Sequence, residues 1–156
     1  MKKIIFISST GGHLSELLQL HTLFDHYDYH LITEYTKSNI PLKDIYKKKM
    51  SFLMYGTKHN LLTYLFIFPI NCIRSLYLYF KLKPDVIIST GAHTAVPMCF
   101  IAHFFKKKVI FIETFANIHT KTLSGRFIYP IADCFIVQWE SMLELYPKAI
   151  YLGWIF

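Results

Sequence analysis

The chain is poor in the residues that mark several common protein classes. Its three cysteines, Cys72, Cys99 and Cys134, are odd in number, far apart and set among apolar neighbours. This pattern indicates neither a disulfide framework nor a metal-binding cluster, so we expect reduced thiols in a cytoplasmic protein. Linkers, low-complexity tracts and short repeats are also missing from the 156 residues. The sequence therefore predicts a single domain over residues 1–156.

Two further absences exclude other classes. The basic start of the chain leads directly into an apolar strand and a glycine turn without a small-residue cleavage site, so we expect no signal peptide. Aromatic residues form 17% of the chain, but they lie inside apolar runs and do not alternate with basic residues. A stacking platform for nucleic acid needs that alternation, and we therefore expect no nucleic-acid partner.

What the chain does contain is apolar surface and positive charge. Hydrophobic residues make up 53% of the chain and charged residues only 17%, so we expect part of the apolar surface to face a membrane or a partner. The formal net charge is +7, with lysine triplets at 47–49 and 106–108. This charge favours anionic partners such as phospholipid, a nucleotide or a diphosphate. For either triplet alone, a solvated lysine run is the alternative.

Short apolar segments alternate with segments of helical period. The strands are predicted at 3–7, 29–33, 52–55, 85–89, 109–113, 134–137 and 150–152. Helices are predicted at 14–20, 60–83, 94–105, 124–131 and 140–146. Apolar strands that alternate with helices indicate an α/β fold, a Rossmann-like parallel sheet with helices on both faces.

Two of the predicted strands end in a glycine turn that carries a histidine. Gly11, Gly12 and His13 follow the first strand, and the sequence Thr90-Gly91-Ala92-His93 follows the strand at 85–89. Backbone N–H groups at the start of the next helix favour an anion there, although a plain structural turn is the alternative. The spacing is not the GxGxxG dinucleotide fingerprint. Because ligands bind beyond the carboxyl ends of parallel strands, we expect both turns and the loop at 113–120 to meet at one edge.

Residues 60–83 form the most apolar segment. Its length matches a bilayer span, but Pro69, Asn71 and Arg74 interrupt it, and spanning would put the flanking strands on opposite sides of the membrane. Aromatic residues and flanking basic residues favour a helix that lies in the membrane interface, with a buried core helix as the alternative. The residues expected at an anionic membrane surface are Leu65, Phe66, Phe68, Arg74, Tyr77 and Lys81.

Three motifs carry a resemblance to a known family: SSTGGH, STGAHTAVP and IETFANIHTKTLSGRFIYPIADCFIVQWE. The sequence resembles PssD/CpsF-type bacterial polysaccharide biosynthesis subunits, which are similar to the Alg14 oligosaccharide biosynthesis family, from residue 2 to about 153. The resemblance implies a single half-domain of a GT-B glycosyltransferase, equivalent to the N-terminal, acceptor-binding half of MurG-like enzymes. A separate small subunit would hold the UDP-sugar donor, so we expect no tightly bound cofactor in this chain.

The resemblance therefore implies a function in capsular or exopolysaccharide biosynthesis. We expect a peripheral subunit at the cytoplasmic face of the cell membrane that helps to transfer a sugar from a UDP-sugar to a polyprenyl-diphosphate-linked saccharide. On its own the chain should have little activity. The alternative is a non-catalytic scaffold that recruits and activates a separate catalytic glycosyltransferase subunit.

Transfer to an acceptor hydroxyl needs a base, and two residues are candidates. His13 matches a histidine in the acceptor cleft of MurG-like enzymes, and an imidazole can titrate near neutral pH. Glu113 ends a strand at the ligand edge, where the family also has an acidic residue. A histidine that only stabilises its turn, and a structural carboxylate, are the respective alternatives.

Substrate binding is expected from the three loops. His93 and Thr94 are candidates for the acceptor diphosphate, at the start of the helix that follows Gly91. The full predicted set is Thr10, Gly11, Gly12, Thr90, Gly91, His93, Thr94, Asn117 and His119. The spacing of His13, His93 and His119 matches no zinc-ligand pattern, so we expect no metal site.

Overall fold

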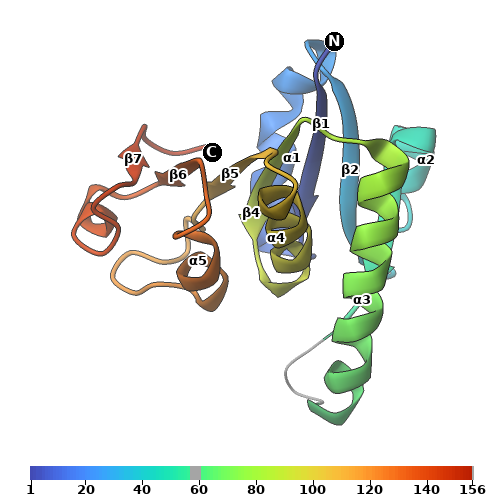
Figure 1. Ribbon diagram of the computed structural model, residues 1–156. Helices are drawn as coiled ribbons and strands as arrows, with labels where there is room; N and C mark the ends of the chain where they lie inside the picture. Colours follow the sequence, from blue (N-terminus) through green and yellow to red (C-terminus); the bar gives the residue numbers. More distant parts are fainter. Residues whose placement is uncertain (57–60, 156) are drawn as a thin grey trace.

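All the strands that the structure describes lie in one parallel sheet. The computed structural model describes residues 1–56 and 61–155, and its strand order is β3-β2-β1-β4-β5-β6-β7 (Figure 1). The strands are β1 (Lys3–Ser8), β2 (Asp28–Tyr35), β3 (Met50–Met54), β4 (Val86–Gly91), β5 (Lys108–Ile112), β6 (Cys134–Val137) and β7 (Ile150–Tyr151). The expected Rossmann-like parallel sheet is confirmed.

The helices are shorter than the hydrophobic period predicts, except for one. The α-helices are α1 (Gly12–Leu18), α2 (Leu42–Tyr46), α3 (Leu61–Leu82), α4 (Val96–Phe104) and α5 (Leu123–Ile128). The 3-10 helices are η1 (Gln19–Asp25), η2 (Lys47–Lys49), η3 (His93–Ala95) and η4 (Glu140–Leu143). The helix expected at 94–105 begins as the 3-10 turn η3, and Pro97 lies in the first turn of α4, where its missing N–H costs no helical hydrogen bond. The helix expected at 140–146 is only η4.

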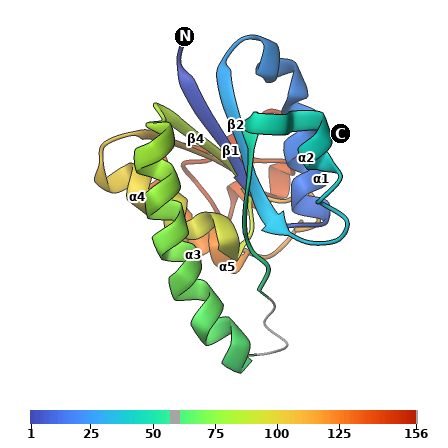
Figure 2. The same ribbon diagram turned by 90° about the vertical axis from the view of Figure 1, so that its right-hand side faces the viewer.

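Helices cover both faces of the sheet. Figure 2 shows α3, α4 and α5 on one face and α1 and α2 on the other. Neighbouring residues of one strand enter different cores, because Ile5 packs under α3 and α4 while Phe6 packs toward α1. This two-sided burial explains why the strands are apolar at nearly every position.

The order of the strands creates one switch point. β1 pairs with β2 on one side and with β4 on the other, and the chain moves outward in opposite directions from there. In open parallel sheets the crevice at such a point, beyond the carboxyl ends of the strands, is where ligands bind. The turns after β1 and β4 lie next to each other at this edge, since Ser9 donates its backbone N–H to the Gly91 carbonyl at 2.8 Å.

The opposite, amino-terminal edge is held by two aspartates. Asp85 accepts the backbone N–H of Lys3 at 3.0 Å and lies 3.4 Å from the Lys107 ammonium. Asp133 accepts the backbone N–H of Val109 at 2.9 Å and lies 2.7 Å from the Lys108 ammonium. These contacts lower the pKa of both carboxyl groups. Two lysines of the 106–108 triplet therefore pair with aspartates far from the switch point.

Helix α3 is anchored to the sheet near its middle and projects beyond it. The side chain of Asn71 is buried and makes two hydrogen bonds of 2.8 Å with the backbone N–H and carbonyl of Met54. The N-terminal half of α3 extends past the carboxyl ends of the strands (Figure 1). Residue 60, the first residue of the predicted helix, lies outside the described residues. The N-terminal half of α3 therefore borders the carboxyl edge of the sheet on one side.

Candidate functional site

A cavity of about 750 Å³ opens at the carboxyl edge, next to the switch point. It lies between the turns after β1 and β4 and the helices α3, α4 and α5. The lining residues are Ser9, Thr10, His13, Glu34, Tyr55, Gly56, Tyr64, Phe68, Ala92, His93, Val96, Thr122, Leu123, Ser124 and Phe127. Hydroxyl, imidazole and carboxylate groups come from the strand ends, while the helices supply mainly apolar side chains. The cavity therefore has one polar side and one apolar side.

His13 lies at the polar side with a defined orientation. Its Nδ1 is 2.8 Å from the carbonyl oxygen of Thr90, and the Thr90 hydroxyl donates to the His13 carbonyl at 2.6 Å. Because a carbonyl oxygen only accepts hydrogen bonds, Nδ1 carries the proton of the neutral ring. Nε2 then keeps its lone pair, which is the form that a general base requires.

Gly91 makes room for this imidazole. Its backbone has φ +97°, and a Cβ at that position would lie 3.2 Å from His13 Nδ1. A side chain would therefore be strained and would crowd the ring. A glycine at the end of β4 is therefore required to leave space for the His13 ring. The sequence alone does not indicate this contact.

Glu34, at the end of β2, is a residue of the site that the sequence analysis missed. Its side chain is only 1% exposed, yet it lines the cavity. Oε2 accepts the backbone N–H of Thr10 at 3.0 Å, and Oε1 accepts the Thr94 hydroxyl at 2.6 Å and lies 3.6 Å from His93 Nε2. Buried Asn39 donates to the Glu34 carbonyl at 2.9 Å and to the Thr10 hydroxyl at 3.1 Å. The Glu34 carboxylate thus joins β2 to the loops after β1 and β4, and Asn39 ties in the loop after β2 through the Glu34 backbone carbonyl.

Glu113 is buried outside the cavity lining. Its carboxylate accepts hydrogen bonds from the hydroxyls of Thr122, at 2.8 Å to Oε1, and Tyr146, at 2.8 Å to Oε2. Burial and the neighbouring carboxylate raise the pKa of Tyr146. Thr122 in turn caps α5 by accepting the Gly125 N–H at 2.9 Å. In this geometry Glu113 fixes the start of α5, and its expected catalytic role stays a prediction without contact to the cavity.

Glu16 is a third buried carboxylate, on the other face of the sheet, and the sequence analysis also missed it. It accepts the Thr114 hydroxyl at 2.7 Å, the Phe115 N–H at 3.2 Å and the Gln138 amide at 3.1 Å. Burial raises its pKa, and these hydrogen bonds oppose that rise. Glu16 therefore joins α1 to the ends of β5 and β6.

The residues predicted to bind substrate separate into three groups. Thr10 and His93 line the cavity. Gly11 and Gly12 are exposed beside it, with open space around them, and Thr90, Gly91 and Thr94 lie behind its lining residues. Asn117 and His119 do not line the cavity either, and the Asn117 amide donates to the Thr120 carbonyl of its own loop at 2.9 Å. The binding role of these nine residues stays a prediction, and several of their side chains hold the loops together, such as Thr94 on Glu34 and Asn117 on Thr120.

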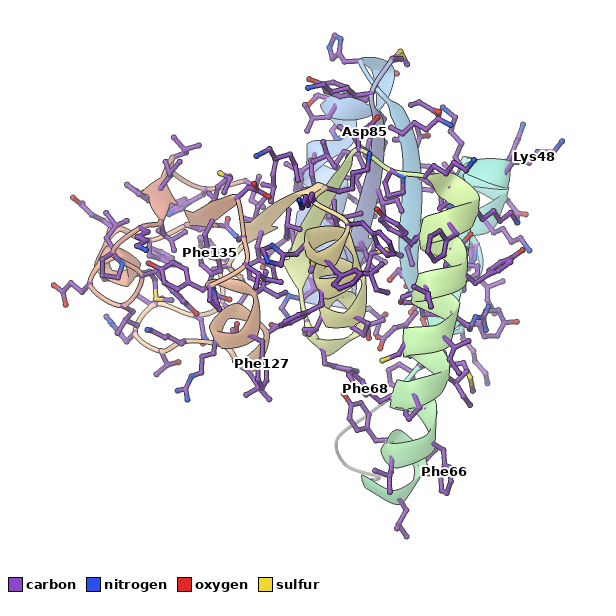
Figure 3. The ribbon with its side chains drawn as sticks, in the orientation of Figure 1. Lys48, Phe66, Phe68, Asp85, Phe127 and Phe135 are labelled. Carbon is purple, nitrogen blue, oxygen red and sulfur yellow. The ribbon has the colours of Figure 1, made fainter. Side chains whose placement is uncertain are left out.

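Helix α3 presents an apolar stripe to solvent. One of the residues predicted at the membrane surface, Phe68, faces the cavity and not the solvent. Leu65, Phe66 and Tyr77 are more than half exposed, whereas Phe68 lines the cavity. Figure 3 shows Phe68 on the side of α3 toward α4, and Phe66 on another side. Arg74 and Lys81 flank the stripe and are exposed. The α3 stripe consists of Leu62, Leu65, Phe66, Ile70, Ile73, Leu76, Tyr77 and Phe80.

Residues 1–56 and 61–155 contain no cluster of metal ligands and one helix of membrane-spanning length. Within these ranges no group of three or more histidine, cysteine, aspartate or glutamate side chains is placed to hold a metal ion. The helix at Leu62–Leu82 is long and apolar enough to cross a membrane, judged by length and composition. Of its 18-residue apolar stretch, 22% is buried inside the protein.

Comparison with known proteins gives one family and one fold. The family model described as "Oligosaccharide biosynthesis protein Alg14 like" matches residues 3–155. The UDP-N-acetylglucosamine transferase subunit ALG14 of Rattus norvegicus is 35% identical over 85 residues, which are 51% of this chain and 39% of that protein. The subunit of the same name from Candida albicans is 39% identical over 79 residues, 47% of this chain and 36% of that protein. The matched part thus spans less than half the length of these curated relatives.

The solved structures with this fold are longer chains. MurG of Acinetobacter baumannii has a TM-score of 0.73 and 15% identity, and the match covers 90% of this chain and 43% of MurG. A Staphylococcus aureus MnaA–UDP structure has a TM-score of 0.77 and 11% identity, covering 99% of this chain and 46% of that one. This chain therefore resembles one half of these structures in fold.

Proposed function

The chain belongs to the family of Alg14-like oligosaccharide biosynthesis proteins, and on this premise we propose that it is the acceptor-binding subunit of a two-component glycosyltransferase. The relatives are named as subunits of UDP-N-acetylglucosamine transferase, which supports a UDP-sugar as the donor. The half-length match to MurG supports a second chain that completes the active site and holds that donor. No cofactor is part of the proposal.

The observation that carries the proposal is the orientation of His13 at the cavity. Its Nδ1 is occupied by the Thr90 carbonyl at 2.8 Å, so Nε2 is the basic nitrogen of a ring that lines the cavity. In the proposed reaction an acceptor hydroxyl attacks the sugar carbon as the bond to UDP breaks, and Nε2 takes the hydroxyl proton. General base catalysis of this kind contributes about 10²–10⁴-fold. The carboxylate of Glu113 has a positioning role through Thr122 and α5.

The proposed acceptor is a polyprenyl-diphosphate-linked saccharide in capsular or exopolysaccharide biosynthesis, as in PssD/CpsF-type subunits. An apolar wall beside a polar floor suits a ligand with both characters. Tyr64, Phe68 and Phe127 are aromatic lining residues on α3 and α5. Tyr64 and Phe68 belong to the same helix as the α3 stripe, so α3 offers a lipid-linked molecule apolar side chains both inside and outside the cavity.

We propose that the chain binds the cytoplasmic face of the membrane as a peripheral protein, through the α3 stripe. A helix that crossed the bilayer would separate β3 from β4, yet both strands belong to one sheet and Asn71 ties α3 to β3. Arg74 and Lys81 beside the stripe suit anionic lipid.

A scaffold without catalytic groups is the second candidate. It is favoured by the number of polar groups at the edge that are engaged in holding loops, such as Thr94 on Glu34 and Thr122 on Glu113. The two candidates differ in one respect, because only the first requires a base from this chain.

The deciding experiment replaces His13 by asparagine. The asparagine amide can still donate to the Thr90 carbonyl, but it has no basic nitrogen. We expect the His13→Asn subunit to bind its partner normally and to lower kcat of the assembled pair by at least about 100-fold. His21→Asn is the matched control, since His21 is exposed and its Nδ1 also lies near a carbonyl, that of Leu18 at 3.1 Å. Full activity in the His13→Asn pair would assign this chain to the scaffold class.

A further inference from the structure

The floor of the cavity is a carboxylate with unused acceptor capacity. Glu34 Oε2 accepts one hydrogen bond, from the Thr10 N–H at 3.0 Å, and Oε1 accepts one strong bond, from the Thr94 hydroxyl at 2.6 Å. Each oxygen of an ionised carboxylate has two acceptor sites. Since Glu34 lines the cavity, a ligand there meets a group that accepts hydrogen bonds and does not donate them.

Three backbone donors of the two glycine turns are already engaged. The N–H of Thr10 donates to Glu34, and the N–H of Ala92 donates to the Ser9 hydroxyl at 3.0 Å. The N–H of Gly91 donates to the Ser89 hydroxyl at 3.0 Å. These three amides therefore bond to the protein itself and are not offered to a ligand in the cavity.

The charge of the side chains that line the cavity also disfavours a phosphate group. Among the described residues that line the cavity there is one acidic side chain and no lysine or arginine. A proton on His93 would cancel the charge of Glu34, 3.6 Å away, without making the pair positive. Much of the excess positive charge lies elsewhere, for example in the 47–49 lysine triplet on η2. The described lining residues therefore offer a diphosphate no lysine or arginine and one like charge.

From these contacts, and resting on the proposed function, we propose that Glu34 accepts a hydrogen bond from a hydroxyl group of an uncharged sugar ring. The cavity then takes the sugar of the acceptor and leaves its diphosphate outside. This places the sugar hydroxyls beside His13, the residue with the free Nε2. It also makes Glu34 a residue that determines which acceptor sugar is used, because a buried carboxylate left without its donor penalises the wrong sugar.

The first test combines Glu34→Gln with acceptors that lack one hydroxyl. The wild-type pair should lose about 10–100-fold in kcat/KM on one of the deoxy acceptors, because a hydrogen bond to a charged group is removed. The Glu34→Gln pair should be slower on the complete acceptor and should lose little more on that same deoxy acceptor. Glu16→Gln is the matched control, since Glu16 is a buried carboxylate outside the cavity, and it should keep the full deoxy penalty. An unchanged penalty in Glu34→Gln for every deoxy acceptor would overturn the proposal.

The second test uses the wild-type chain and needs neither transfer nor a folded variant. The ring signals of His13 and His93 are followed by NMR while N-acetylglucosamine methyl glycoside or inorganic diphosphate is added. The glycoside should shift both rings and the diphosphate should shift neither. The reverse result would overturn the proposal. Absence of transfer by the assembled pair would count against the proposed function alone, because the NMR titration reports which part of the acceptor enters the cavity without any transfer.

Discussion

At the scale of single residues, three buried glutamates hold the carboxyl edge together. Glu16, Glu34 and Glu113 each accept hydrogen bonds from groups distant in the chain, such as Thr114, Thr94 and Tyr146. Burying a carboxylate is costly unless its oxygens are paired, so these contacts are mutually dependent. The loops at the carboxyl edge are thereby held to one another by side-chain hydrogen bonds.

Gly125 tests this dependence. A methyl group there would overlap the side-chain oxygens of Glu113, Tyr146 and Thr122. We expect Gly125→Ala to lower the free energy of unfolding by about 1–3 kcal/mol, because a packed polar cluster must shift. Urea unfolding measures the change. Gly12→Ala is the control, since a Cβ at Gly12 meets nothing within 4 Å, and a loss of stability there equal to that at Gly125 would contradict the explanation.

His30 on β2 makes the stability depend on pH. Burial, reinforced by the charge of Lys81 and opposed by Asp28, lowers the pKa of His30 from 6.5 to about 4. The unfolded chain therefore binds a proton below pH 6.5 that the folded chain refuses until about pH 4, and stability falls as the pH decreases through this window. Relative to His30→Gln, the wild type should lose about 2 kcal/mol of unfolding free energy between pH 7 and pH 4, after allowance for partial exposure. The exposed His21 gives the control, because a His21→Gln variant should follow the wild-type curve.

The residues found from sequence differ from those missed in one respect. His13 and Glu113 stand next to glycine or at the end of an apolar run, so their place at the edge is visible in the sequence. Glu34 lies within the segment ITEY, where a polar residue reads as a solvent-facing position of a strand. Its partners Thr10 and Thr94 are 24 and 60 residues away, so only the folded sheet reveals the contact. The signal that was available is a glutamate just after the apolar part of a strand, at its carboxyl end.

At the scale of elements, α3 has two faces with different tasks. The Asn71 side packs on β3, while the α3 stripe is open to solvent. The sequence predicted the helix and the exposure of most of its apolar residues. It did not predict that Phe68 faces the cavity, because that depends on where α4 and α5 lie.

A pair of isoleucines tests membrane binding by α3. Ile73 on the α3 stripe is 69% exposed and Ile45 on α2, at the other face of the sheet, is 67% exposed. We expect Ile73→Asp to weaken binding to anionic phospholipid vesicles by about 10-fold or more, because it removes apolar contact and adds repulsion. Co-sedimentation with vesicles measures this. Ile45→Asp should bind as the wild type does and both variants should melt normally; equal weakening by both would show that α3 is not the contact.

At the scale of the whole molecule, the described strands form one parallel sheet, and the proposed function places the donor site in a second chain. The alternation of apolar strands and helices was enough to predict the parallel sheet, since the central strands β1 and β4 are buried on both faces. Local packing determined what the alternation did not, namely that the helix predicted at 14–20 changes to a 3-10 turn at Gln19 and that the helix predicted at 140–146 is a 3-10 turn.

The division of the site between two chains predicts how the isolated subunit responds to donor. UDP-N-acetylglucosamine at millimolar concentration should shift its thermal midpoint by less than about 1 °C, because the proposed donor site belongs to the partner. Differential scanning fluorimetry with and without the nucleotide sugar measures the shift. A rise of several degrees would assign a donor site to this chain.

The central position of β1 bears on how the protein is made. Ile4 pairs with Tyr29 on one side and with Val86 on the other, so the second partner of β1 is synthesised long after the first. Helix α3 lies between them in the sequence and leaves the ribosome before the sheet that it covers is complete. During that interval the side of α3 that packs against α4 lacks its partner, and contact with a membrane or a chaperone would protect the nascent chain until β4 and α4 are made.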